Sequence, residues 1–177
     1  MKTPTHLAIN YLILPRLGID RRFHKAFLLG GVLPDVPICF LFVGVFLWQQ
    51  DVATTVEVFR HLYETHAWVI AAHSVLHSPL SLLAMLVLSF LVGKYQARLE
   101  VFIAGCFCHS LVDIYTHVDD GPIVFWPFDW QQRFTGIVSH WDSNYGGNLV
   151  MLVEMTIMLM AVLVMVYKRN SRTVWLF

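Results

Sequence analysis

Apolar residues are gathered into four long stretches, each interrupted by only a few polar positions. The stretches cover residues 26–48, 67–92, 99–115 and 148–167. A helix needs about 20 apolar residues to cross the hydrocarbon core of a bilayer, and three of the stretches reach that length only if their polar insertions are tolerated. A shorter apolar segment, residues 5–14, is too short to span. The pattern predicts an all-α fold: a polytopic membrane helical bundle of about four transmembrane helices plus a short N-terminal helix, either interfacial or tucked into the bundle.

Composition supports the membrane assignment. Of the 177 residues, 57% are hydrophobic and 14% are charged, whereas a soluble domain carries about 25% charged residues. Basic and acidic residues balance at 12 each, and no basic face offers a footprint for nucleic acid. Since no repeat or linker divides the chain, we expect a single integral-membrane domain over residues 1–177. The turn-rich segment 118–147 is expected to form an outer loop or cap.

The charges of the connecting segments predict an orientation. Basic residues precede the first apolar stretch, separate the second from the third and follow the fourth (Arg16, Arg21, Arg22, Lys25, Lys94, Arg98, Lys168, Arg169 and Arg172). The loops 49–66 and 117–147 are mainly acidic and hold only Arg60 and Arg133. Positive residues favour the cytoplasmic side of a membrane. We therefore expect a multi-pass protein with both termini in the cytoplasm.

Ionisable residues occur inside these apolar stretches, where they are costly. An aspartate near the centre of a membrane helix costs roughly 2.5–3.5 kcal/mol on insertion scales. Such residues usually face the interior of the bundle, pair with one another and mark a functional path. The candidates are His6, Asp35, His73, His77, His109 and Asp113.

The spacing of these candidates favours a metal site. His73 and His77 are four residues apart, as are His109 and Asp113, so each pair shares one face of a helix. Imidazole and carboxylate groups together suit Zn²⁺ first, with Mn²⁺ or Fe²⁺ possible. A dication would also neutralise the buried carboxylates. The alternatives are a His–Asp hydrogen bond within a core and a proton or ion path.

Several further polar residues have more than one candidate role. His117, Asp119 and Asp120 continue the third apolar stretch and are either ligands or solvated, and His140 and Asp142 are candidates for substrate contacts. Glu154 lies inside the fourth stretch and needs a partner, for which the same site is one candidate.

Four short motifs occur in an order that resembles one family of proteins. They are TH at 5–6, LPDVP at 33–37, HSVLHSP at 73–79, and GCFCHSLVDIYTH at 105–117 followed by WPF at 126–128. This order resembles the LexA-regulated, membrane-bound metal-dependent hydrolases of the bacterial inner membrane, and the likeness covers about residues 3–130. The chain departs from the family pattern at Ser74 and Val75, where Arg-Gly is common, and at Cys108, which replaces a serine.

The resemblance implies a location, an activity and a ligand set. The family is distantly similar to zinc-dependent phospholipases C and single-strand nucleases, which are all-helical and hold zinc with His and Asp. Carried over by position, the implied metal ligands are His6, Asp35, His73 or His77, His109 and Asp113. We therefore expect an inner-membrane, metal-dependent hydrolase of a phosphoester in a lipid or lipid-linked substrate. In this reading Asp35 or Asp113 bridges two metals or acts as general base. The alternative is a non-catalytic metal-binding or proton- or ion-conducting membrane protein.

Overall fold

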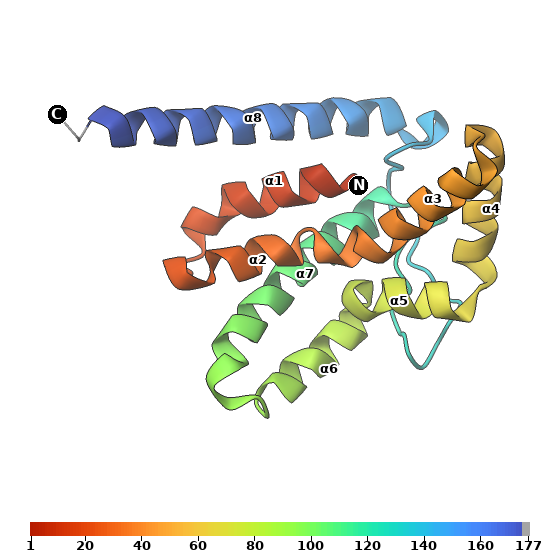
Figure 1. Cartoon of the computed structure of the whole chain (residues 1–177), viewed down its shortest axis with the longest axis horizontal. Helices are drawn as coiled ribbons and strands as arrows, with labels where there is room; N and C mark the ends of the chain where they lie inside the picture. Colours follow the sequence, from red (N-terminus) through yellow and green to blue (C-terminus); the bar gives the residue numbers. More distant parts are fainter. Residues whose placement is uncertain (175–177) are drawn as a thin grey trace.

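The computed structural model describes residues 1–174 of the chain, and side chains through residue 170. Within that part the fold is helical, and the only β pairing is an isolated bridge between Ile123 and Arg133. The helices are α1 Thr3–Ile13, α2 His24–Gly30, α3 Val36–Gln49, α4 Val52–Thr65, α5 Ala67–His77, α6 Pro79–Ser89, α7 Gln96–Thr116 and α8 Gly147–Val174 (Figure 1). The predicted all-α class is confirmed.

Membrane-length helical segments match the apolar stretches of the sequence. Three segments are long and apolar enough to cross a bilayer, namely Arg21–Gln49, Gly93–Thr116 and Gly147–Asn170. A fourth crossing is possible if α5 and α6, which are bent by 61° at their junction, form one span. Pro79 explains the break, since proline donates no backbone hydrogen bond and restricts the residue before it. The bundle thus has three, or up to four, helices of membrane-spanning character.

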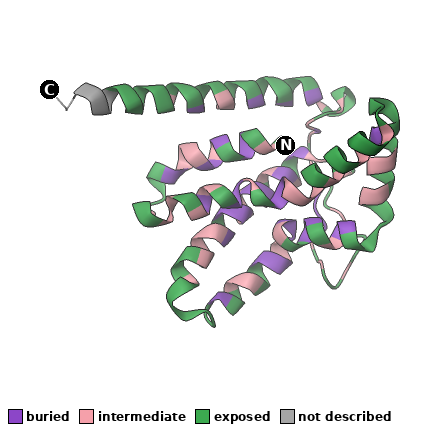
Figure 2. Ribbon diagram, viewed as in Figure 1, coloured by how far each residue is buried: buried purple, intermediate pink, exposed green. Residues whose placement is uncertain are grey.

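The N-terminal helix α1 is folded into the bundle, which decides between the two predicted placements. Its residues Thr5, His6, Ala8 and Asn10 are buried, and it packs against α2, α7 and α8. In Figure 2 the buried residues gather where α1, α2 and α7 meet. Just before α1, the Met1 amino group contacts Asp113. The last turns of α8 lie near the other end of α1, where Lys168 Nζ is 5.2 Å from the Tyr11 ring centroid. The orientation across the membrane stays a prediction.

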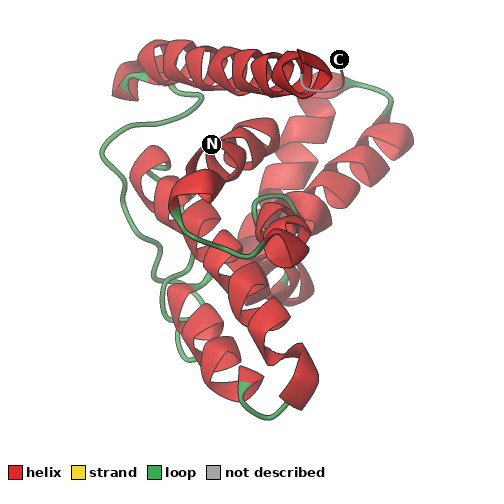
Figure 3. Cartoon of the chain, turned by 90° about the vertical axis from the view of Figure 1, so that its left-hand side faces the viewer, coloured by secondary structure: helices red, strands yellow, loops and turns green. Residues whose placement is uncertain are grey.

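The two acidic loops differ from one another in structure. Residues 49–66, expected as a loop, contain α4, whose start is capped by Asp51 accepting a hydrogen bond from the Thr54 amide at 2.8 Å. Residues 118–147 run as an extended loop along one side of the bundle (Figure 3). This loop is fixed at the α5–α6 break, where Ser78 Oγ donates to Val124 and Trp126 carbonyls, and at the end of α7, where Gly136 N–H donates to the His117 carbonyl.

Two glycines let the backbones of α2 and α7 touch. A Cβ on Gly105 would collide with the Phe27 carbonyl oxygen, and a Cβ on Gly30 would collide with the Phe102 carbonyl oxygen and lie 2.7 Å from the Cys106 amide. Small residues permit such close helix packing in membranes. Asn10 reinforces the crossing, because its Nδ2 donates to the Phe27 and Gly105 carbonyls at 3.2 and 3.3 Å.

Gly105→Ala is expected to destabilise the protein strongly. Overpacking typically costs about 1–3 kcal/mol, and here the colliding group is backbone that has no rotamer to change. Thermal unfolding in detergent measures the effect. Gly44→Ala is the matched control, since nothing lies within 4 Å of a Cβ at Gly44 and alanine is the better helix former by roughly 0.5–1 kcal/mol. Equal melting temperatures for both variants would contradict the crossing.

Candidate metal centre

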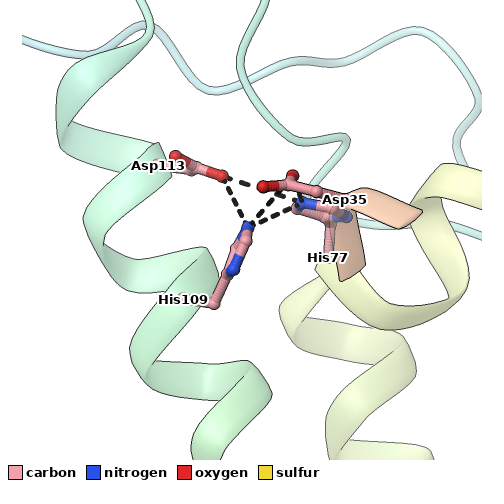
Figure 4. Close-up of side chains that lie close together, drawn as sticks. All are labelled: Asp35, His77, His109 and Asp113. Carbon is pink, nitrogen blue, oxygen red and sulfur yellow. Dashed lines mark hydrogen bonds and ion pairs between the residues drawn. The ribbon is translucent and has the colours of Figure 1, made fainter. Parts of the chain in front are cut away.

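Four side chains from three elements converge in the interior of the bundle (Figure 4). Asp35 ends the 3-10 turn Leu33–Asp35 that joins α2 to α3, His77 is the last residue of α5, and His109 and Asp113 lie one turn apart on α7. The turn at Pro34 and the break after Ser78 thus place Asp35 and His77 at element ends that face α7. The predicted i, i+4 pair on α7 is on one face, as expected.

The spacing of the ligand atoms fits one metal ion. His109 Nε2 lies 3.1 Å from His77 Nε2, 3.3 Å from Asp35 Oδ1 and 3.1 Å from Asp113 Oδ2. His77 Nε2 lies 3.4 Å from Asp35 Oδ1 and 3.7 Å from Asp113 Oδ2. A tetrahedral zinc site with ligand bonds of about 2.0–2.2 Å has ligand–ligand edges of roughly 3.3–3.6 Å. The group Asp35, His77, His109 and Asp113 could therefore hold a metal ion.

The electrostatics of the centre also favour a cation. All four side chains are buried, with Asp35 only 6% and Asp113 only 4% exposed. Asp35 is paired only with histidines, and Asp113 with histidines and the Met1 amino group at 2.5 Å, among the ion pairs of the described residues. Burying a carboxylate costs several kcal/mol, roughly, unless it is paired or bound to a metal. A dication between the two carboxylates would offset that cost.

Backbone carbonyls fix both imidazoles with their Nε2 atoms towards the centre. His77 Nδ1 lies 2.9 Å from the His73 carbonyl, and His109 Nδ1 lies 3.1 Å from the Gly31 carbonyl. A carbonyl can only accept, so each Nδ1 carries the proton and each Nε2 keeps its lone pair. This is the usual outer support of metal-binding histidines. The Gly31 carbonyl reaches His109 because α2 and α7 are in contact.

The two other predicted ligands lie beside this group. His6 Nε2 is 3.1 Å from Asp113 Oδ1, the oxygen that faces away from His109, and the His6 ring stacks on the His109 ring at 3.6 Å between centroids. His73 stacks on His77 at 3.7 Å, so its ring nitrogens do not converge with the four. Of the alternatives His73 and His77, the geometry favours His77.

Residues at the beginning of α1 support the centre in a way that the motifs did not indicate. Thr3 Oγ1 donates to Asp35 Oδ2 at 2.5 Å, which leaves Oδ1 for the centre. His6 contacts Asp113 Oδ1 in a similar way. Residues of α1 therefore contact, in each carboxylate, the oxygen that does not point at His109. The TH motif at 5–6 gave no signal of this role, because Thr3 lies outside the motif and its contact depends on α1 folding back into the bundle.

Glu154 has its partner in α1. It is 1% exposed, its Oε1 accepts the Lys2 backbone N–H at 2.9 Å, and its Oε2 lies 3.1 Å from Lys2 Nζ. Lys2 is the N-cap residue of α1, and its own side chain makes no capping hydrogen bond to the helix. A carboxylate at a helix N-terminus satisfies free amides and complements the helix dipole. Glu154 therefore caps α1 from α8 and does not enter the four-residue group.

A cavity of about 700 Å³ leads to the carboxylate side of the centre. Asp35, Asp113 and His73 form one part of its lining, and apolar side chains of α3 and α4 form another: Ile38, Phe42, Val56 and Phe59. Arg60 also lines it and lies over the Trp141 ring at 5.5 Å. The centre is buried, yet it faces an amphipathic cavity.

His117 and His140 lie on another wall of this cavity. Their ring centroids are 4.3 Å apart, and His117 Nδ1 lies 3.0 Å from the Asp113 carbonyl. Burial lowers the pKa of His117, and it lowers the pKa of His140 to about 4. Both rings are therefore neutral near pH 7, and neither belongs to the group of four.

Comparison with known proteins gives a family and a location. No curated protein and no solved structure matches the chain. One family model does match, over residues 1–177, and its description is YdjM inner membrane protein. The match agrees with the membrane-length helices of the fold. Over its whole length, then, the chain belongs to the YdjM family of inner membrane proteins.

Proposed function

We propose that the chain is a membrane-embedded, metal-dependent hydrolase that acts on a phosphoester in a lipid or lipid-linked substrate. The observation that carries this proposal is the convergence of Asp35, His77, His109 and Asp113 at the inner end of an amphipathic cavity. A site that only stabilised the fold would need no such access. The resemblance of the ordered motifs to membrane-bound hydrolases agrees with it.

The donor set favours zinc, with Mn²⁺ or Fe²⁺ as alternatives. Two imidazole nitrogens and two carboxylate oxygens are ligands common to all three ions. When bound, such an ion supplies polarisation of a phosphoryl oxygen and a water molecule acidic enough to attack near neutral pH. Asp35 and Asp113 would hold the ion from the cavity side, and His77 and His109 from the protein side.

The chain's own groups supply the rest of the chemistry. Asp35 and Asp113 are the predicted bases. Asp35 Oδ2 accepts a hydrogen bond from Thr3, and Asp113 Oδ1 lies against His6. His73 lines the cavity next to the centre and is a further proton acceptor within reach of a bound substrate. An imidazole in that position suits general base catalysis.

The lining of the cavity supports an amphiphilic substrate. Its apolar residues on α3 and α4 suit acyl or isoprenoid chains, and its volume of about 700 Å³ falls within the range of ligand sites, roughly 300–1,000 Å³. Arg60 adds a positive charge, which suits a phosphate group. A substrate already dissolved in the membrane would reach a centre at this depth without leaving the bilayer.

Metal content is the first test of the proposal. We expect at least one equivalent of zinc, manganese or iron per chain in protein purified without chelator, measured by mass spectrometry. His109→Ala and Asp113→Ala remove ligands and should lose the ion. His66→Ala is the control, since His66 is exposed and lies at the opposite end of α5 from His77. Wild-type protein without metal would sink the hydrolase proposal and favour the proton-path alternative.

Arg60→Gln is expected to raise KM for a phosphoester lipid about tenfold while kcat changes little. A hydrogen bond to a charged group contributes about 1.5–3 kcal/mol, and Arg60 lines the cavity without belonging to the four-residue group. Phosphate release from lipids in mixed micelles gives both constants. Arg22→Gln removes an exposed arginine that pairs with Asp20 and should leave both constants unchanged. A fall in kcat alone would contradict this role for Arg60.

Glu154→Ala is expected to weaken metal binding about 10- to 100-fold, the usual cost of losing outer support of a metal site. Without its cap, the beginning of α1 loses the position from which Thr3 and His6 contact the two carboxylates. Glu154→Gln keeps an oxygen for the Lys2 amide and should recover most of the affinity, measured by zinc titration of the folded apoprotein.

The matched control for Glu154 is Val150→Ala, one turn earlier on the buried face of α8. It removes a buried apolar side chain of α8 without removing a polar contact, so it should lower the melting temperature and leave the metal affinity unchanged. An equal loss of metal affinity in Val150→Ala and Glu154→Ala would show that α8 acts through packing alone.

A further inference from the structure

A second cavity, of about 590 Å³, lies near the other end of α1. Its walls come from the turn after α1, the 3-10 turn that begins at Arg21, and the late turns of α8. Gly18 has a positive φ of 64°, a conformation that favours glycine. It lies in the turn that brings Arg21 and His24 into the same cavity lining as Lys168 of α8.

The lining of this cavity carries charge of one sign. Arg21 and Lys168 supply this charge, His24 lies beside them with its Nε2 3.0 Å from the Ile19 carbonyl oxygen, and no carboxylate is among the lining residues of the described structure. Asp20, the acidic residue of this turn, pairs with Arg22 at 3.1 Å. Lys168 Nζ lies 5.2 Å from the Tyr11 ring centroid, so an aromatic face forms part of the same wall. Such a lining repels cations and favours an anion.

The position of the cavity identifies the kind of anion. Arg21 begins a helical segment long enough to cross a membrane, and Lys168 lies within three residues of the end of another. The ends of membrane-length helices lie at the level of the lipid headgroups. Basic pockets between helices at that level bind the phosphates of anionic lipids.

We propose that this cavity binds the phosphate group of an anionic phospholipid, with Arg21 and Lys168 contacting the phosphate and Leu14 and Pro15 contacting the apolar part of the lipid. The proposal does not depend on the metal centre, because no residue lines both cavities. A bound lipid would also join the turn after α1 to α8, which otherwise packs mainly on α1.

Native mass spectrometry of the full chain tests the proposal by counting retained lipids. The probes are phosphatidylglycerol and phosphatidylcholine in mixed micelles, with inorganic phosphate as competitor. We expect retention of phosphatidylglycerol in preference to phosphatidylcholine. Each basic residue near an anionic lipid contributes about a fivefold gain in affinity, so Arg21→Gln/Lys168→Gln should weaken phosphatidylglycerol binding by about 25-fold.

The control is Lys94→Gln/Arg98→Gln, which removes the same charge from the turn before α7 and from the first turn of α7, both outside the cavity. It should leave binding unchanged, and an equal loss in this pair would overturn the site in favour of diffuse surface charge. Displacement of the lipid by millimolar inorganic phosphate would assign the cavity to a soluble anion and overturn the lipid source. If the double variant does not fold, Arg21→Gln alone should show about a fivefold loss, and no loss would overturn the proposal.

Discussion

Contact between the backbones of α2 and α7 is the constraint on which the metal centre depends. Gly30 and Gly105 allow it, and Asn10 ties both helices to α1 through two carbonyl oxygens. Only at this separation does the Gly31 carbonyl reach His109 Nδ1. The same approach brings the turn that carries Asp35 against α7. A side chain at either glycine would therefore alter the packing of two helices and also the distance between ligands that are far apart in sequence.

Compensation of buried charge is the second constraint, and it links α8 to the centre. Asp35 and Asp113 each direct one oxygen at the histidines of the group and the other at α1. The beginning of α1 is in turn held by Glu154, the single charged residue of α8 between Gly147 and Tyr167. Both oxygens of each buried carboxylate, Asp35, Asp113 and Glu154, thus have a partner. These contacts offset the cost of burying three carboxylates in a chain with few charges.

The sequence predicted the helical spans and the identity of the polar residues within them, because both follow from local pattern. Hydrophobic length defines the spans, and the i, i+4 spacing on α7 defines the His109–Asp113 pair. It did not separate His73 from His77, since both occupy one face of α5 and only the bend before Pro79 brings His77 to the centre. The pairing of Lys2 with Glu154 joins residues 152 apart, and no local pattern encodes such a contact.

The short length of α1 lets it lie inside the bundle with His6 buried beside the centre. An 11-residue helix is too short to cross a bilayer, and its exposed amides would be costly in hydrocarbon. Glu154 satisfies one of these amides from within the bundle, so the helix can begin beside the centre instead of at the membrane surface. The beginning of α1 also forms part of the amphipathic cavity, which Lys2, Thr3 and Pro4 help to line. A segment too short to span therefore contributes both to the support of the buried centre and to the wall of the cavity beside it.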